Sequence, residues 1–594
     1  MTTLSAFTSP VQKTIRFILL TLLFSFTAQQ ATANDKKFND LLDRHWQDQL
    51  AQSPTFATSL GVRDYDDQLS DPSLEEFDAG IATATSFLNE LNKIKRSSLS
   101  QANQLNYDLL KLDLSNVIEE ARHGGKFLIM NNRNGPHLNL TSLPNRLPFF
   151  TLADYQSYVA RLAKMADYMG KSTQRIRAGL EAGWVQPCAP MQGFEDSIKT
   201  HIVEDIDTSV FLDPFDDKPN VIPQDSFDEL KAQASTVIKA QIIPAFTTFL
   251  AFYMDEYQPT CRTKVGADSM PGGKEYYDFQ VRYYTTTDQT ADQIHQIGLG
   301  EVARIKAEML EVIKEAEFEG SFEEWLEYLK TNEDFYPKTP EERMTAVAVI
   351  SKKIDGALPK LFGLLPRMPY GLKEIPADIA EKTTTAYYMP PAGDGSRAGF
   401  HVVNTSLLHT RPLYQLEALS LHEAVPGHHL QIALMQELDL PEFRKFGGQT
   451  VFVEGWGLYA ERLGLEVGFY ETPYTNFGRL SYEMWRACRL VVDTGLHSKG
   501  WTRQQAIDYM AANSGLSMNN ITSEVDRYIS WPAQALAYKT GELKIRELRA
   551  RAEEQLGANF DVRAFHDKVL ENGALPLSVL ENVVNEWLAE QAES

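Results

Sequence analysis

The chain has 594 residues, of which 43% are hydrophobic and 23% charged, and its net charge is −23 at pH 7. These proportions are globular and exclude disorder over the whole chain, because such a chain can bury enough apolar surface to offset its lost entropy. Collagen-like and coiled-coil structures are excluded by the 35 glycines, the 28 prolines and the lack of a sustained heptad pattern. The acidic balance argues against binding to nucleic acid or to anionic membranes, which needs a basic surface.

The first 33 residues have the pattern of a secretory signal peptide. Lys13 and Arg16 precede an apolar run at 17–26, and residues 31–33 read ATA, a small-x-small cleavage site. The run is shorter than the ~20 residues that a permanent membrane helix needs, although an uncleaved anchor is the alternative. We expect a secreted, periplasmic mature chain from about residue 34. Lipid attachment is not expected, because no cysteine lies near the cleavage site, and no later stretch is expected to span a membrane.

The mature chain has mostly helical periodicity. Apolar residues recur at helical spacing over 36–130, 154–183, 228–257 and, most strongly, 290–316. Strand patterns are few, and the best is residues 382–406, where two β-rich pieces flank a Pro/Gly turn. The sequence therefore predicts a mainly α-helical protein with a small amount of sheet.

Three cysteines are far apart in the sequence, at Cys188, Cys261 and Cys488. They form no C-x-x-C pair, so a thiolate zinc site is not indicated. Export permits one disulfide, and Cys188 with Cys261 is the pair we expect, because both lie beside prolines in loop-like sequence. Three separate thiols are the alternative.

Residues 422–429 read HEAVPGHH and indicate a metal site. Imidazole is a ligand suited to zinc, and the neighbouring carboxylate of Glu423 can act as a base. In the familiar pattern H-E-x-x-H the second histidine lies four residues after the first, on the same helix face. Here the fourth residue after His422 is Pro426, so the sequence departs from that pattern.

His428 and His429 lie too far along an unbroken helix to share a metal with His422. Seven positions correspond to about 10 Å along the axis, whereas both nitrogens must lie about 2.1 Å from one zinc ion. Pro426 removes a backbone N–H, and Gly427 permits unusual dihedrals. We therefore predict a break in the metal helix that brings either His428 or His429 back towards His422.

A third ligand is expected downstream, in the segment 450–468. Glu454 is flanked by Gly455 and Gly457, which let a second helix approach the metal helix closely. Glu461 follows seven residues later and lies on the same helix face. Glu454 is the predicted ligand, and Glu461 is predicted to orient a ligating histidine or to serve the structure.

These segments resemble the bacterial proteins grouped as domain of unknown function 885. The members are regarded as candidate zinc metallopeptidases of the gluzincin type. The resemblance covers most of the mature chain and rests on residues 272–287, 294–309, 386–405, 421–431, 452–461 and 527–545.

The resemblance implies a fold similar to those of thimet oligopeptidase and carboxypeptidase Taq: a large helical bowl with a small β-sheet beside the metal helix. It implies one metallohydrolase domain over 34–594, with a catalytic core at about 380–545. The implied metal is Zn²⁺, and its ligands are His422, His428 and Glu454. Two extra residues inside the motif keep His429 as the alternative to His428.

The implied activity is metal-assisted hydrolysis. Zinc would bind a water, and Glu423 would take its proton and later give it to the leaving amine. The developing oxyanion needs further donors, and the segment with Arg527, Tyr528, Tyr538 and Lys539 offers them. Tyr528 and Tyr538 are the predicted catalytic donors.

The expected partner is a peptide or another small amide. The stretch 399–404, read as an edge strand, could pair with an extended peptide, and Arg397 could bind a substrate carboxylate. Two other functions stay open: a zinc hydrolase of a non-peptide amide or ester, and a non-catalytic periplasmic binding protein. Two histidines and one carboxylate also suit non-heme iron. The oligomeric state is not predicted.

Overall fold

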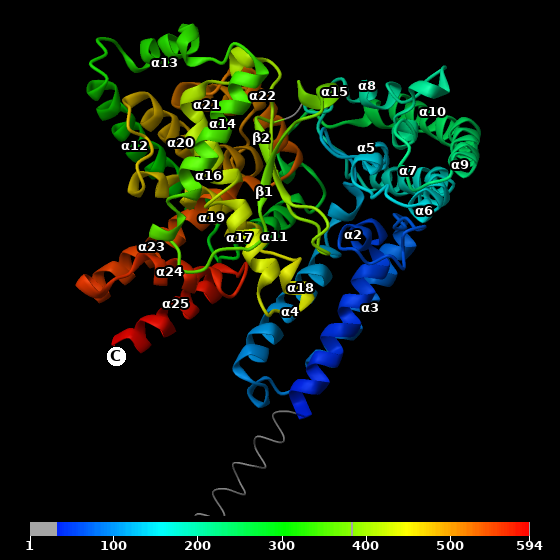
Figure 1. Ribbon diagram of the computed structural model, residues 1–594, viewed down its shortest axis with the longest axis horizontal. Helices are drawn as coiled ribbons and strands as arrows, with labels where there is room; N and C mark the ends of the chain where they lie inside the picture. Colours follow the sequence, from blue (N-terminus) through cyan, green and yellow to red (C-terminus); the bar gives the residue numbers. More distant parts are fainter. Residues whose placement is uncertain (1–32, 382–383, 593–594) are drawn as a thin grey trace, which may run out of the picture. The chain divides into compact units, whose positions relative to one another are not determined.

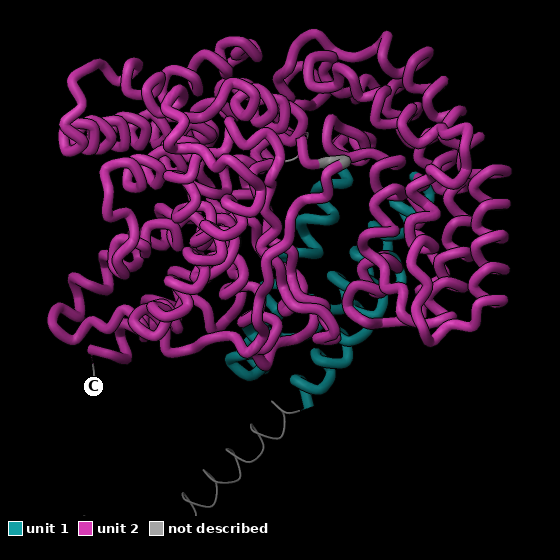
Figure 2. Tube along the Cα trace, turned by 45° about the horizontal axis from the view of Figure 1, so that its top comes forward, with its two compact units in different colours: residues 1–52, 74–122 teal, residues 53–73, 123–594 magenta. Residues whose placement is uncertain are grey.

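The computed structural model describes residues 33–381 and 384–592, which are mainly α-helical with one three-stranded sheet (Figure 1). Residues 1–32 of the predicted signal peptide lie outside the described residues. The chain divides into two compact units (Figure 2): residues up to 52 with 74–122, and residues 53–73 with 123–594. Whether residues 34–594 fold as one domain stays a prediction.

The described part of the first unit contains three α-helices. They are residues 33–52, α3 (Leu74–Leu91) and α4 (Gln101–Glu120). Apolar residues at helical spacing, among them Phe38 and Leu110, are fully buried. The side chain of Ser100 caps α4 by accepting a hydrogen bond from the backbone N–H of Asn103.

The second unit begins with a set of helices around an aromatic core. The helices are α2 (Pro54–Ser59), α5 (Pro136–Thr141), α6 (Leu152–Leu162), α7 (Met165–Glu181), α8 (Phe194–Lys199), α9 (Gln224–Val237) and α10 (Ile243–Phe252). Their core includes Tyr155, Phe211 and Phe246. Cys188 and Cys261 form a disulfide, which confirms the expected pair, and Cys488 is a buried thiol.

One long helix in this part has an apolar composition that the sequence analysis did not expect. From α9 the chain stays helical to Thr260, through the π-helical turns η6 (Ile238–Ile242) and η7 (Tyr253–Tyr257). By length and composition alone, residues 224–260 could cross a membrane, so the expectation that no stretch after the signal peptide has the length and composition of a membrane span was wrong. Phe246, Phe249 and Tyr253 on this helix belong to the buried core, which accounts for part of its apolar character.

The rest of the second unit carries the motif residues. Its helices are α11 (Gly273–Thr285), α12 (Ala291–Glu315), α13 (Phe322–Thr331), α14 (Pro340–Asp355), α15 (Ala377–Ala380), α16 (Leu416–Glu423), α17 (His428–Glu437), α18 (Glu442–Lys445), α19 (Thr450–Leu463), α20 (Pro473–Ser498), α21 (Arg503–Asn513), α22 (Met518–Ser530), α23 (Ala537–Leu556), α24 (Val562–Leu570) and α25 (Leu577–Ala592). The predicted helix at 290–316 is confirmed as α12, which Thr290 and Gln293 start with a capping box.

Helix α20 is the central element of this region. Almost every residue from Phe477 to His497 is buried, so the helix is covered on all sides. It packs along α12 and also contacts α16, α21 and α22. Helix α19 packs against α16, α17 and α23. The motif helices α16, α17 and α19 are therefore fixed by neighbours that are themselves buried.

The sheet has the order β1-β3-β2 and lies beside the motif helices. Its strands are β1 (Tyr370–Glu374), β2 (Ala386–Met389) and β3 (Gly399–Val403). The two predicted β-rich pieces are β2 and β3, which pair antiparallel. Strand β1, which pairs parallel with β3, was not predicted. The expectation that residues 399–404 form a free edge was wrong, because β3 is the central strand and both of its edges are already paired.

Candidate metal centre

The helix that carries the motif is broken between its histidines, as predicted. Helix α16 ends at Glu423 and α17 begins at His428, and the peptide bond between Val425 and Pro426 is cis. A Cβ atom on Gly427 would lie 1.9 Å from the carbonyl oxygen of His422, so only glycine fits this close approach. The break brings the imidazole rings of His422 and His428 to a centroid distance of 4.6 Å.

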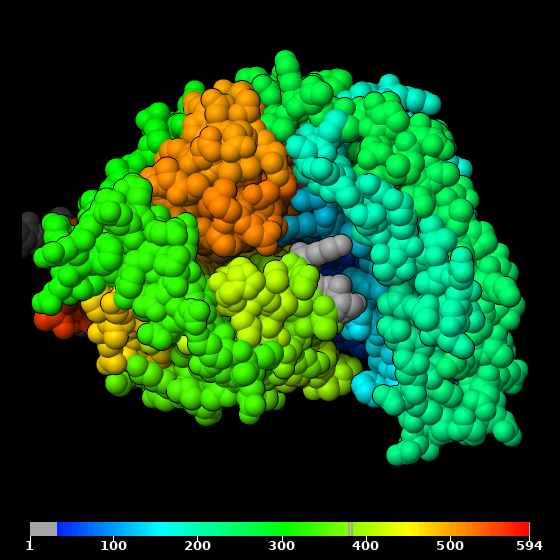
Figure 3. All heavy atoms as spheres, turned by 90° about the horizontal axis from the view of Figure 1, so that it is seen from above, coloured from blue at the N-terminus to red at the C-terminus, as the bar shows by residue number. Residues whose placement is uncertain are grey.

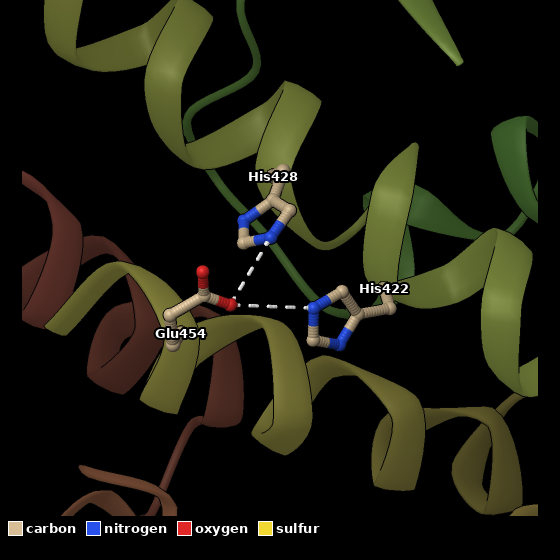
Figure 4. A group of neighbouring side chains, drawn as sticks. All are labelled: His422, His428 and Glu454. Carbon is tan, nitrogen blue, oxygen red and sulfur yellow. Dashed lines mark ion pairs between the residues drawn. The ribbon is translucent and has the colours of Figure 1, made fainter. Parts of the chain in front are cut away.

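Helix α19 brings Glu454 to both imidazoles (Figure 4). Its Oε2 atom lies 3.6 Å from Nε2 of His422 and 3.5 Å from Nε2 of His428. One ligand atom from each residue lies within 4.8 Å of the others. Four ligands at about 2.1 Å from a tetrahedral zinc ion stand roughly 3.4 Å apart, so these two distances suit a shared metal. The structure thus contains a candidate metal site made of two histidines and one glutamate.

The glycines beside Glu454 permit two different close contacts. A Cβ atom on Gly457 would lie 2.8 Å from Cε1 of His422, so Gly457 makes room for the ligand ring, as predicted. A Cβ atom on Gly455 would lie 2.5 Å from Cα of Gly541 on α23. Gly455 therefore allows α19 to approach α23 rather than the motif helix, which differs from the prediction.

Glu461 holds the other nitrogen of His422. Its Oε1 atom lies 2.8 Å from Nδ1 of His422 and 3.5 Å from Nη2 of Arg486. The hydroxyl of Tyr470 donates to the backbone carbonyl of Glu461. A carboxylate behind the ring fixes its orientation and leaves Nε2 free to bind a metal. This contact agrees with the orienting role predicted for Glu461.

The structure separates the two adjacent histidines. His428 lies in the cluster, and its Nδ1 atom is buried without a hydrogen-bond partner among the described residues. Both nitrogens of His429 are engaged, Nδ1 with the hydroxyl of Tyr388 at 2.9 Å and Nε2 with the backbone carbonyl of Met368 at 2.9 Å. Burial lowers the pKa of His429 to about 4, so this side chain is neutral. His428, the preferred ligand, is the one that faces Glu454.

Without a metal, His422 and Glu454 form an ion pair. Burial lowers the pKa of His422, but its contacts with Glu454 and Glu461 outweigh burial and raise the pKa to about 10. Burial also opposes ionisation of Glu454, yet hydrogen bonding to His422 and His428 holds its pKa well below the usual range. A divalent cation would replace the imidazole proton as the positive partner of Glu454.

Glu423 is the last residue of α16 and is partly exposed. Its charge acts on His422 and on Tyr482 of α20, which is buried and whose pKa burial raises to about 12. Tyr482 was missed in the sequence, because nothing in its local pattern distinguishes it from the other buried aromatics of α20.

The predicted catalytic tyrosines are engaged elsewhere in the interior. The hydroxyl of Tyr528 accepts hydrogen bonds from the indole of Trp485 and from Nε of Arg489, each at 2.9 Å. The hydroxyl of Tyr538 accepts one from Arg527 at 3.2 Å. Among the described hydrogen bonds, neither hydroxyl is joined to the three candidate ligands. Their catalytic role stays a prediction.

Two other predicted donors also have partners. The Nζ atom of Lys539 is enclosed by the carboxylates of Glu301, Glu483 and Glu542, each at 2.9 Å. Arg397 donates to the backbone carbonyl of Ala398. Its charge also acts on Tyr388, the hydrogen-bond partner of His429. Tyr388, whose ring centroid lies 6.4 Å from that of His428, therefore lies beside the candidate centre.

Solved structures resemble this chain over nearly its whole length. A crystal structure from Colwellia psychrerythraea, named "putative lipoprotein", has 29% sequence identity and a TM-score of 0.88, with 94% of this chain and 99% of that chain covered. One from Shewanella oneidensis, named "putative lipoprotein of unknown function", has 19% identity and a TM-score of 0.69, with 92% and 99% covered. The second likeness concerns the fold alone. The comparison with curated proteins gives no match.

The family pattern described as "Bacterial protein of unknown function (DUF885)" matches residues 54–584, a span that includes all three candidate metal ligands. The family resemblance noted in the sequence is thereby confirmed, and the chain belongs to the DUF885 family.

Proposed function

We propose that this protein is an exported, zinc-dependent hydrolase that cleaves short peptides. The observation that carries the proposal is the geometry around Glu454: two Nε2 atoms face one carboxylate oxygen at 3.5 and 3.6 Å. This set of two histidines and one glutamate is found in catalytic zinc sites, which keep one position open. The same donors also suit iron, and the adjacent Glu423 favours hydrolysis.

Each residue of the cluster has a separate task in this proposal. His422, His428 and Glu454 hold the metal, and Glu461 orients the ring of His422. When bound, zinc supplies Lewis-acid activation of the substrate carbonyl and of water. Glu423 takes one proton from the attacking water and passes it to the leaving amine. The water oxygen joins the carbonyl carbon as the C–N bond breaks, so atoms and charge balance.

Three observations support export of the protein. The sequence begins with a signal-peptide pattern, Cys188 and Cys261 form a disulfide, and the similar structure from Colwellia psychrerythraea carries the name "putative lipoprotein". Disulfides persist in oxidising compartments such as the periplasm. Because no cysteine precedes Cys188, the chain offers no cysteine for lipid attachment near its predicted cleavage site. We therefore propose a periplasmic location.

The proposal is tested by metal content and peptide digestion of matched variants. We expect the mature wild type to hold about one zinc per chain and to cleave a mixed-peptide digest. Glu423→Gln should keep the metal and lose cleavage by about 100-fold or more, since general-base catalysis contributes typically 10²–10⁴-fold.

The neighbouring histidines supply the matched pair for this test. His428→Ala should lose the metal, whereas His429→Ala should keep it if the variant is folded by circular dichroism. A wild type that stays metal-free after zinc is supplied would overturn the site. Full cleavage by Glu423→Gln would overturn the role of Glu423.

A further inference from the structure

A cavity of about 410 Å³ lies beside α16, outside the metal cluster. Its volume is in the range of small-molecule binding sites. Leu416 and Leu419 of α16 line it, and the same helix ends in His422 and Glu423. Residues 515–520 of the segment entering α22 form another wall. Figure 3 shows this orange part of the surface next to the yellow-green part that precedes α16 in the sequence.

Two buried arginines line this cavity without a carboxylate partner. Arg343 of α14 is 1% exposed; its Nη1 atom donates to the backbone carbonyl of Arg411 at 3.0 Å, and its Nε atom is buried with no partner. Arg411 donates through Nε to the carbonyl of Ser406 at 2.7 Å. Within the described ranges, neither guanidinium forms an ion pair, although each has five N–H donors.

Two other buried arginines are neutralised by carboxylates. Arg489 pairs with Glu524 at 2.9 Å, and Arg479 pairs with Glu483 at 3.3 Å. Burial and the charge of Arg411 lower the pKa of Arg343 to about 10, which still leaves it protonated at neutral pH. A buried charge is costly unless it is paired. One wall of the cavity therefore carries a positive charge that a bound anion would neutralise.

The acids of the cavity do not supply that anion. Glu524 is held by Arg489, by Arg527 at 3.3 Å and by Arg133 at 3.3 Å. Glu381 lines the cavity but is exposed to solvent.

Tyr482 connects the arginines with the reactive end of α16. It lines the cavity, and the charges of both Arg343 and Glu423 act on it. From Leu416 to Glu423, α16 rises about 10 Å, which equals about three residues of extended peptide. The cavity wall at Leu416 thus lies within a few peptide residues of Glu423, the base that would activate the attacking water.

We propose that Arg343 and Arg411 bind the terminal carboxylate of a short peptide, so that the enzyme releases residues from the carboxyl end of its substrate. This inference rests on the proposed hydrolase function. Guanidinium groups bind carboxylates through paired, charge-assisted hydrogen bonds. The unpartnered N–H groups of the two arginines supply these donors.

The test compares Ala-Ala-Ala with its carboxy-terminal amide on the zinc-loaded protein. We expect wild type to cleave the free acid with a kcat/KM about 10- to 100-fold higher than the amide, the range for lost charged hydrogen bonds. Arg343→Met and Arg411→Met should lower kcat/KM for the free acid by the same factor and leave the amide unchanged. Arg444→Met, a buried arginine outside the cavity, is the matched control and should affect neither substrate.

Binding to Glu423→Gln, measured by calorimetry, separates this inference from the proposed hydrolysis. We expect Glu423→Gln to bind the free acid more tightly than the amide. If the double variant Glu423→Gln, Arg343→Met loses this difference, the carboxylate site is supported even if no cleavage occurs. Equal binding and equal cleavage of acid and amide by wild type would overturn the carboxylate site and leave the hydrolase intact. If Arg343→Met does not fold, Arg411→Met and the comparison of acid and amide on the wild type still test the carboxylate site.

Discussion

Two clusters of buried ionisable groups in the second unit balance their charge in different ways. Around Lys539, which is 0% exposed, three carboxylates contact one ammonium group, and Arg304, Arg479 and Arg546 supply further positive charge. Around Glu454, no lysine or arginine among the described residues forms an ion pair with the carboxylate, and two imidazoles face it. The first cluster is complete within the protein, whereas the second can be completed by an added cation.

The two clusters also differ in what holds the positive charge of Lys539 and of His422. At Lys539 burial lowers the pKa, but the charges of Glu542, Glu483 and Glu301 outweigh it and raise the pKa well above its ordinary value. The ammonium group is therefore permanent and structural. At His422 the positive charge is a proton that a metal can displace. The first cluster therefore stabilises the fold, whereas the second is a candidate metal site.

The largest expected effect comes from breaking the complete cluster. Lys539→Met should lower the free energy of unfolding by about 3–5 kcal/mol, because it leaves buried carboxylates without their cation. Urea unfolding in excess zinc measures this change. Lys544→Met on the same helix α23 removes more exposed pairs with Glu547 and Glu581 and should cost less than about 1 kcal/mol. A similar decrease in the free energy of unfolding in the two variants would contradict the contrast between the buried cluster and the more exposed pairs.

Zinc should stabilise the second cluster and leave the first unaffected. At a free zinc concentration of 1,000 times Kd, the free energy of unfolding should rise by about 4 kcal/mol over the chelator-treated protein. Thermal melting with zinc and with chelator tests this difference. Glu454→Ala should abolish the shift, while Lys544→Met should keep it. A zinc shift that persists in Glu454→Ala would place the metal elsewhere.

Removing the group behind His422 should have a smaller effect. Glu461→Gln should weaken zinc affinity by about 10- to 100-fold, since partners that orient a metal ligand have effects of this size. Competition with a chromogenic chelator gives the affinity directly. Glu466→Gln, whose carboxylate pairs with Arg549 near the surface, should leave the affinity at the wild-type value. An unchanged affinity in Glu461→Gln would reduce Glu461 to a packing role.

Asp493 is a buried acid that is neutralised by its own proton rather than by a neighbouring cation. Burial raises the pKa of Asp493 to about 7, against the donors Tyr277 and the backbone N–H of Ala533. Because the pKa of Asp493 in the folded state exceeds its ordinary value near 3.8, binding of the proton stabilises the folded protein. This contribution to the free energy of unfolding is complete below about pH 4 and is lost as the pH rises through about 7.

The measurable result is a difference in slope. Between about pH 4 and 7, the free energy of unfolding of wild type should fall relative to Asp493→Asn by up to about 1.4 kcal/mol per pH unit. Denaturant unfolding at several pH values gives both curves. Parallel curves would show that Asp493 ionises normally in the folded protein.

The candidate ligands could be predicted because their chemistry is local in the sequence. His422 and Glu423 are adjacent, and Pro426 with Gly427 marks the break in the helix. Glu454 follows within a second helical pattern. The choice between His428 and His429 could not be made from the sequence. It depends on which imidazole the helix break turns towards Glu454, and on which one forms hydrogen bonds with Tyr388 of β2 and the backbone of Met368.

The sheet shows the same limit. The alternating patterns of β2 and β3 were recognisable, but the position of β3 was misjudged, because β1 comes from a separate segment that pairs with it. Strand order depends on which edges meet in space, which a period-two pattern does not encode.

By itself, the sequence determined the helical class, the broken motif and the family, since each depends on residue types at short range or on a pattern along the chain. Only the tertiary structure decided which imidazole faces Glu454, which carboxylate lies behind His422, and that Arg343 and Arg411 share a cavity beside α16. Those facts depend on side chains from separate helices, whose distances are set by packing around the buried helix α20.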